Sequence, residues 1–465
     1  MALGQFMVVV DVTILNIALP SLAADLEADM PELEWALIAY SLTMIGLVPI
    51  FGRISDVLGR KRLYVTGLAL FGLASALAAA SPAIEALIAA RVLQAIGGAL
   101  ITSNTLAILT DVFPVGERGV AMGLQSVLIS GGAAIGPVLG GFLVTHFGWE
   151  AVFLVNLPVG AASALLATKV LPSLKSGRAR EPLDWPGAAL LLGGLFGTLM
   201  GLTRAPEWGW ADPRTLGAFG VGLPLLALFA WRQRRATHPL VKPSLMTIRP
   251  FVAGQVAGLF ATMVLVSMVF LLPFYWQALR GLSAQRAGLL MLPVPLSLMV
   301  MAPIAGRLSD RIGARGLTSV GLVGGAAAAF LIGQVDERTA VVDVLWRLAL
   351  FGLSLGMFLA PNNNATMSAA PAADRGVASG LLALFRFTGQ VLGIAFAGTL
   401  FLHAAGHADS TEILTAEGIR ASADVSGMTA DFVVGYRTVC LAVVPIALVG
   451  AALSFSRGAH PEAGR

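Results

Sequence analysis

The stretch Gly52–Arg62 reads GRISDVLGRKR, and a similar stretch, GRLSDRIGAR, occupies Gly306–Arg315, 254 residues later. Two more matches follow in the same order: Arg91 with Arg347 at an offset of 256 residues, and Glu117–Ala121 (ERGVA) with Asp374–Ala378 (DRGVA) at 257. Long-period self-similarity of this kind is typical of chains built from repeated structural units. The sequence therefore predicts two related halves.

The composition indicates in which solvent these halves fold. The 465 residues are 57% hydrophobic and only 12% charged, whereas soluble domains carry about 25% charged residues. Long apolar runs recur along the chain, each close to the roughly 20 residues that a helix needs to cross a bilayer. They are too continuous for the alternating strands of a membrane barrel. We therefore predict an all-α membrane protein.

Fourteen spanning helices are predicted from these runs, as two sets of six with one pair between them. The first six are 2–22, 34–51, 63–80, 84–108, 120–145 and 150–170, the pair is 186–203 and 214–231, and the last six are 250–273, 286–305, 316–334, 341–363, 377–401 and 432–455. The predicted domains are thus an N-terminal bundle (1–170), a segment with cytoplasmic linkers and an inserted two-helix hairpin (171–248), and a C-terminal bundle (249–465).

Charge in the loops predicts the orientation. If both termini are cytoplasmic, most of the 30 Lys and Arg residues fall on the cytoplasmic side, as the positive-inside rule requires. No Lys or Arg precedes Asp11, so either the natural chain begins further upstream or its first helix is short at the cytoplasmic end. We expect a multi-pass protein of a bacterial inner membrane.

Composition also excludes several kinds of partner. The net charge of +4 needs no nucleic acid to explain it. Cys440 is the single cysteine, which rules out an intrachain disulfide and a cysteine metal cluster. We expect no metal, no cofactor and no nucleic acid, with the lipid bilayer, protons and a small-molecule substrate as partners.

Three motifs resemble those of a known family. Gly52–Arg62 resembles the loop signature of the major facilitator superfamily. The helix 120–145 contains Gly132, Gly136, Pro137, Gly140 and Gly141, an arrangement similar to the antiporter motif of the drug-exporting branches. Asp11–Pro20 (DVTILNIALP) and the inserted hairpin resemble the fourteen-helix drug:proton antiporter family. The resemblance covers essentially the whole chain and implies a substrate site between the two halves, near the bilayer midplane.

The resemblance implies a gate in the repeated loop. Asp56 would accept hydrogen bonds from the N-terminal amides of a neighbouring helix and lock the outward-facing state, with Arg60 and Asp111 relaying charge. Gly52 and Gly59 would allow a tight turn and close helix approach, and Asp310 would be a weaker copy of Asp56. A basic loop that only sets the orientation is the alternative interpretation.

The glycines of the antiporter-like motif share a helix face. Gly132, Gly136 and Gly140 are spaced at i, i+4 and i+8, and Pro137 removes a backbone hydrogen bond in mid-span. The spacing predicts a bendable, closely packed surface. The resemblance favours a hinge or a seal against leaks, while plain helix packing remains the alternative.

Asp11 and Arg91 are the predicted coupling pair. An aspartate inside a spanning helix costs about 3 kcal/mol on insertion scales, and such residues usually mark an ion or substrate path. Arg91 keeps its charge and would tune the neighbouring acid. The alternatives are a carboxylate near the cytoplasmic interface and a structural hydrogen-bond anchor.

Further polar residues are predicted to line a cavity for the substrate. From Arg91 a polar stripe follows one face of its helix, and the second half carries a comparable set. The predicted lining residues are Asn16, Gln94, Thr102, Arg347, Asn363, Arg386 and Gln390.

The function predicted from these features is proton-coupled export of small amphipathic compounds, such as drugs and antibiotics, by alternating access in a monomer. The sequence contains no GxxxxGK[ST] loop for ATP. It also lacks an HExxH motif, and we expect no enzymatic activity. The alternative functions are an importer or uniporter, or an exporter dedicated to one endogenous metabolite.

Overall fold

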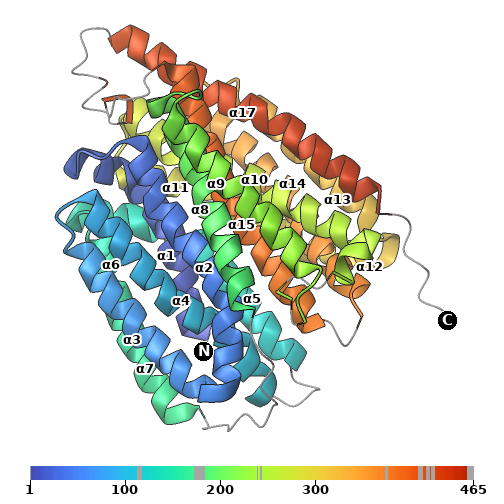
Figure 1. Cartoon of the computed structure of the whole chain (residues 1–465). Helices are drawn as coiled ribbons and strands as arrows, with labels where there is room; N and C mark the ends of the chain where they lie inside the picture. The colour runs from blue at the N-terminus through green and yellow to red at the C-terminus, as the bar shows by residue number, and fades with distance from the viewer. Residues whose placement is uncertain are drawn as a thin grey trace. The chain divides into compact units, whose positions relative to one another are not determined.

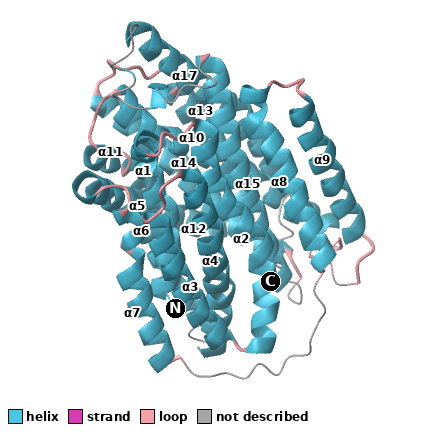
Figure 2. Ribbon diagram, turned by 60° about the vertical axis from the view of Figure 1, so that its left-hand side comes forward, coloured by secondary structure: helices cyan, strands magenta, loops and turns pink. Residues whose placement is uncertain are grey.

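The computed structural model describes residues 2–112, 118–171, 184–237, 239–240, 243–371, 375–406, 412–414, 419 and 425–457. Within these ranges the chain consists of helices joined by loops, without strands (Figure 2). The side chains of Asp56, Asp111 and Asp310 lie outside the described part. The gating contacts of these three aspartates therefore stay predictions.

The helices follow the predicted apolar runs closely (Figure 1). Up to residue 233 they are α1 (Ala2–Asp25), α2 (Met30–Leu58), α3 (Arg60–Ala79), α4 (Ile84–Val112), α5 (Arg118–Phe147), α6 (Ala151–Leu154), α7 (Asn156–Val170), α8 (Trp185–Trp208) and α9 (Pro213–Gln233). Beyond it they are α10 (Arg249–Phe274), α11 (Ala284–Leu290), α12 (Pro293–Ile312), α13 (Ala314–Ile332), α14 (Val341–Ala369), α15 (Arg375–Ala405) and α17 (Val425–Phe455). Short 3-10 turns at Leu245–Thr247 and Glu412–Leu414 and a π-turn at Tyr275–Leu279 complete the helical segments.

Two predicted single helices are each divided in two, at positions where proline accounts for the break. The run 150–170 is interrupted at Val155, and α7 begins at Asn156, two residues before Pro158. The run 286–305 is divided between α11 and α12, and Pro293 begins α12. Proline has no N–H to continue the hydrogen bonding of a preceding helix, but it fits the first turn of a new one.

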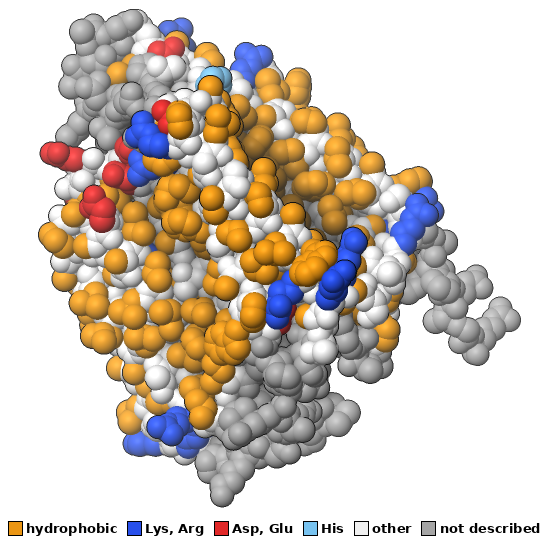
Figure 3. Space-filling model, viewed as in Figure 1, with side chains coloured by type: hydrophobic (Ala, Val, Ile, Leu, Met, Phe, Trp, Pro, Cys, Tyr) orange, Lys and Arg blue, Asp and Glu red, His pale blue; other side chains and the backbone are white. Residues whose placement is uncertain are grey.

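Twelve helices in the described residues are long and apolar enough to cross a membrane. Neither α2 nor α5 is among the twelve, although they contain 29 and 30 residues. The chain is therefore a multi-pass membrane protein, and fourteen spans remain a prediction. Figure 3 shows hydrophobic side chains spread over most of the visible face, with Lys and Arg in a few small groups.

The chain forms two compact units. The first consists of Met1–Thr198, Gly217–Leu240 and Leu282–Leu289. Within it α4 packs against α2 and α3, α1 against α5, and α7 against α3. The first part of α8 lies on α2, where the Trp35 and Phe196 ring centroids are 5.4 Å apart. Part of the predicted hairpin is thus integral to this unit.

The second unit consists of Leu199–Leu216, Val241–Gly281 and Leu290–Arg465. Here α14 packs against α12 and α13, α10 against α15, and α17 against α13. These pairs reproduce those of the first unit when α10, α12, α13, α14, α15 and α17 are matched with α1, α2, α3, α4, α5 and α7. The duplication seen in the sequence therefore extends to helix packing.

The repeated loop has the same backbone geometry in each unit. Gly59 and Gly313 have φ of 94° and 81°, which favours glycine. Their N–H groups donate to Ser55 O (3.0 Å) and Ser309 O (2.9 Å). A Cβ on Gly52 would meet no described atom within 4 Å, and the predicted role of this glycine in a close helix approach stays a prediction.

Candidate functional site

Asp11 lies on α1 with only 1% of its surface exposed. Its Oδ2 accepts a hydrogen bond from Arg91 Nη1 at 2.5 Å. Its Oδ1 accepts from Gln94 Nε2 at 2.7 Å and from Asn156 Nδ2 at 2.8 Å. Three donors from α4 and α7 therefore surround one buried carboxylate.

Arg91 is held by several groups at once. Its Nη1 also donates to Gln94 Oε1, which lies on the same face of α4 because the two residues are three apart. Its Nε donates to the carbonyl oxygen of Ala36 at 3.2 Å. Its guanidinium carbon lies 4.2 Å from the ring centroid of Tyr40, within cation–π range. The planar, forked guanidinium group of an arginine is required to make these contacts together.

Ser75 connects the cluster to α3. Its hydroxyl donates to Phe71 O at 2.8 Å and accepts from Gln94 Nε2 at 2.8 Å. Asn156 Nδ2 lies 3.4 Å from the same oxygen. Asn156 is the first residue of α7, so the break at Val155 places its side chain at the cluster.

The whole cluster is buried, which makes its charge balance costly to disturb. Asp11, Arg91, Gln94, Asn156, Ser75 and Tyr40 are each at most 2% exposed. A buried ion pair recovers its desolvation cost only when further hydrogen bonds satisfy the remaining atoms, and removal of one partner costs about 3–5 kcal/mol. Gln94 and Asn156 supply such bonds.

The sequence singled out Asp11, Arg91 and Gln94, but Ser75 and Asn156 were missed. Ser75 and Asn156 carry no charge, and small polar residues in apolar helices usually bond to their own backbone. A second carboxylate was also missed: Glu34 on α2 is fully buried. Glu34 could have been found from the sequence, because it is a charged residue within the predicted apolar run 34–51.

The glycines of α5 lie against α1, next to the buried cluster. A Cβ on Gly132 would lie 3.2 Å from the Phe6 ring and 3.3 Å from Val10, and one on Gly136 would overlap Thr13. A Cβ on Gly140 would lie 2.9 Å from Ile14 O. The shared glycine face thus allows close approach to the helix that carries Asp11.

The opposite edge of the motif contacts α11. A Cβ on Gly141 would lie 2.9 Å from Gln285 Cα, and one on Gly288 would overlap the carbonyl oxygen of Pro137. Thr145 Oγ1 also accepts from Gln285 N at 2.9 Å. Pro137 and Gly141 are therefore part of a backbone-to-backbone contact inside the first unit.

The predicted cavity residues of the first unit differ in burial and in hydrogen bonding. Gln94 is fully buried and lies in the Asp11 cluster. Asn16 is half-buried and donates to Val12 O at 3.3 Å. Thr102 Oγ1 is buried without a hydrogen-bond partner among the described residues. Arg60, predicted for the gate, is buried.

The corresponding residues of the second unit do not form a comparable cluster in the described structure. Arg347 donates to Leu331 O at 3.0 Å. Asn363 is exposed, whereas its neighbour Asn362 is buried and donates to Gly254 O. Arg386 is exposed with its guanidinium carbon 5.2 Å from the Phe387 ring centroid, and Gln390 is half-buried. Among the described side chains, no group of three His, Cys, Asp or Glu could hold a metal ion.

Residues 1–394 match the family model of the Major Facilitator Superfamily. The chain is 33% identical to a tetracenomycin C resistance and export protein of Streptomyces glaucescens, over 87% of this chain and 75% of that protein. It is also 33% identical to a riboflavin transporter of Clostridioides difficile, over 86% of each. Several further relatives have names of drug or antibiotic resistance proteins.

The fold also matches a solved structure. A bacterial homologue of the human lysosomal transporter Spinster, in an inward-facing and unoccupied conformation, superposes with a TM-score of 0.73. The match covers 98% of this chain and 95% of that one at 16% sequence identity. At this identity the similarity concerns the fold alone.

Proposed function

The chain belongs to the major facilitator superfamily, and we propose that it is a proton-coupled exporter of small amphipathic compounds. The superfamily is one of transporters, so the open questions are the driving ion, the direction and the substrate. The observation that carries the proposal is the buried Asp11–Arg91 pair. Because Asp11 is buried in this pair, the uptake or release of its proton must be accompanied by a rearrangement of the helices around it.

The linkage follows from the charge balance. In the observed arrangement Asp11 accepts three hydrogen bonds, which suits the ionised carboxylate. Protonation would leave the Arg91 charge buried without its counter-ion, at a cost of several kcal/mol. The cluster is therefore stable either closed and ionised, or open and protonated. Opening requires α1 to move relative to α4.

The α5 glycines give α1 a surface along which to move. The contacts of Gly132, Gly136 and Gly140 with α1 involve no bulky side chain on α5. Small residues permit such close approach in membrane helices. We propose that α1 shifts along this face as Asp11 gains or loses its proton. In this scheme Pro137 and Gly141 seal the pathway by their contact with α11.

Export is the proposed direction because of the relatives. The relative from Streptomyces glaucescens is named for resistance and export, and other relatives are named for drug resistance. The riboflavin transporter, at the same 33% identity, favours the second candidate, a transporter dedicated to one metabolite. The two candidates differ in breadth of substrate.

The membrane arrangement that we propose has fourteen spans in a bacterial inner membrane, with both termini cytoplasmic. The support is the twelve apolar helices together with the 29 residues of α2 and the 30 of α5. We further propose that the protein functions as a monomer. We also propose that it belongs to the fourteen-helix drug:proton antiporter branch of the superfamily. No cofactor is proposed, because the proton gradient would supply the energy.

The test uses purified protein in proteoliposomes with an imposed pH gradient. The probes are ethidium, tetracenomycin C and riboflavin. Antiport predicts uptake that is driven when the interior is acidic and abolished by a protonophore. Uptake driven by an acidic exterior, or unaffected by either gradient, would contradict the exporter and favour an importer or uniporter. Transport of riboflavin alone would favour the dedicated transporter.

A further inference from the structure

An open cavity that the proposed transport cycle does not use lies between α8 and α9 of the hairpin. In the middle of the hairpin the two helices touch through glycine: a Cβ on Gly197 would lie 3.0 Å from Gly222 Cα, and one on Gly194 would lie 2.7 Å from the Leu226 side chain. Nearer to Asp184 the helices are lined by larger side chains. A space remains between them there.

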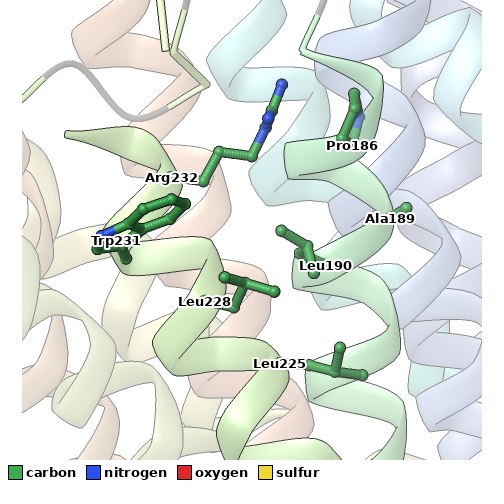
Figure 4. Close-up of a pocket in the computed structure, with 7 residues that line it drawn as sticks. All are labelled: Pro186, Ala189, Leu190, Leu225, Leu228, Trp231 and Arg232. Carbon is green, nitrogen blue, oxygen red and sulfur yellow. The ribbon is translucent and has the colours of Figure 1, made fainter. Parts of the chain in front are cut away.

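This space has a volume of about 480 Å³ and an apolar lining (Figure 4). It is bordered by Pro186, Ala189, Leu190, Leu225, Leu228, Trp231 and Arg232. Leu190 and Leu228 point toward each other across it, and Arg232 lies at the end next to Pro186. The volume lies within the range of roughly 300–1,000 Å³ that is typical of ligand pockets.

The charged end of the cavity is built by several hydrogen bonds. The Asp184 carboxylate accepts from Arg232 Nε at 2.7 Å, from Gln233 Nε2 at 2.8 Å and from Gly187 N at 3.0 Å. Burial alone would raise the pKa of Asp184, but the bonds from Arg232, Gly187 and Gln233 outweigh it and hold the pKa below its ordinary value. Asp184 therefore stays ionised and orients the guanidinium of Arg232.

The two terminal amino groups of Arg232 remain available in the described structure, because Asp184 contacts only Nε. Two more basic residues follow directly: Arg234 and Arg235 are exposed, and the guanidinium carbon of Arg235 lies 4.6 Å from the Trp231 ring centroid. The apolar cavity thus ends in a cluster of positive charge beside a tryptophan. Tryptophan at such a position is typical of the membrane interface.

The outer face of α9 is directed away from the protein. Only 11% of its most apolar stretch is buried, and Leu223 on this face is exposed, as are Leu228 and Trp231, which border the cavity. In a membrane protein such a face meets lipid. A ligand can therefore reach the cavity from the bilayer.

We propose that the cavity binds one anionic glycerophospholipid, with its phosphate on Arg232 and Arg235 and an acyl chain between Leu190 and Leu228. A lipophilic cation would be repelled by the arginines, and a water-soluble anion would gain nothing from the leucines. An anionic phospholipid satisfies both ends of the site. Basic residues near a membrane surface attract anionic lipids in the same way.

The test compares lipid adducts of the detergent-purified full chain by native mass spectrometry, with phosphatidylglycerol and phosphatidylcholine in equal parts. Wild-type protein should retain phosphatidylglycerol in preference, and Arg232→Gln should weaken its binding about fivefold. Arg214→Gln is the matched control, since Arg214 also pairs with an aspartate, Asp212 (3.2 Å), and lies 5.2 Å from the Trp208 ring at the other end of α9. It should bind within about twofold of wild type.

A second pair of variants tests the acyl-chain site. Leu228→Trp should fill the cavity and abolish the preference, whereas Leu223→Trp, on an exposed face of the same helix, should retain it. Equal effects of Arg232→Gln and Arg214→Gln, or full binding by Leu228→Trp, would overturn the proposal. Displacement of the bound lipid by inorganic phosphate as readily as by free phosphatidylglycerol would also overturn the proposal, because it would show that the site does not bind the acyl chain.

Wild-type protein provides a measurement that does not depend on any variant folding. Phosphatidylglycerol with a photoreactive group on its acyl chain, in vesicles of phosphatidylcholine, should label peptides that contain residues 186–190 and 225–232. Labelling that is spread over other helices and spares these peptides would contradict the assigned site.

Discussion

Asp11 and Arg91 are 80 residues apart in the chain, yet their side chains meet at 2.5 Å with 1% of each residue exposed. This contact joins α1 to α4. Gln94 extends it along α4, and Asn156 and Ser75 extend it to α7 and α3. One buried carboxylate therefore connects four helices of the first unit, and its charge state bears on the packing of all four.

Asp11→Asn should abolish proton-driven transport even when the amount of folded protein in the vesicles is matched to that of wild type. An amide keeps the size and some hydrogen bonds of the carboxylate but cannot carry a proton. The measurement is ethidium uptake into proteoliposomes with an acidic interior, which should fall to the level of protein-free vesicles. Glu34→Gln, which neutralises another buried carboxylate of the first unit, is the comparison and should retain uptake. Active transport by the Asp11 variant would move the coupling site elsewhere.

Arg91→Gln should destabilise the protein by about 3–5 kcal/mol, because it leaves the Asp11 charge buried and unpaired. The double variant Asp11→Asn with Arg91→Gln should recover most of this loss, since neither charge remains. Thermal unfolding in detergent gives both values and closes a double-mutant cycle. Additive losses in the double variant would show that the two residues do not stabilise each other.

Arg91→Lys should also fail, although it preserves the charge. An ammonium group cannot reproduce the planar fork that contacts Asp11, Gln94 and Ala36 O together. We expect at least about a tenfold lower initial rate of ethidium uptake, corresponding to a loss of about 1.4 kcal/mol. Wild-type rates in Arg91→Lys would mean that charge alone is sufficient.

Gly136→Ala should destabilise the protein by about 1–3 kcal/mol, because the new methyl group would overlap Thr13 on α1. Gly131→Ala on the same helix is the matched control, since a Cβ there meets no described atom within 4 Å. It should be neutral or stabilising, as alanine favours helix over glycine. Equal thermal stability of the two variants would contradict close packing at Gly136.

Because Asp184 stays ionised, phosphatidylglycerol binding should not change with pH between about 5 and 8. The pKa of Asp184 in the folded protein lies below its ordinary value of 3.8. A carboxylate with a lowered pKa contributes its full stabilisation above the ordinary value and loses it only as the pH falls through the folded-state pKa. Adduct counts measured across this range should therefore agree. A decrease on acidification to pH 5 would mean that another group controls the site.

The sequence alone was sufficient for the helices and for their duplication. A spanning helix must satisfy its backbone hydrogen bonds internally, so it can be located in the sequence from a local apolar run of sufficient length. Gly59 and Gly313 illustrate the duplication: matching letters at an offset of 254 correspond to matching positive φ values. The breaks at Val155 and before Pro293 were missed, since a short interruption leaves the run apolar.

Only the tertiary structure showed which faces of the helices meet. Asp11 and Arg91 could be paired in advance because isolated charges in apolar helices require partners. Ser75 and Asn156 could not, because each resembles an ordinary small polar residue until α3 and α7 are placed beside α1. The Asp184–Arg232 pair likewise depends on the folding back of α9 onto α8. The rotation of each helix about its axis is decided by packing against residues far away in the chain, which no local pattern contains.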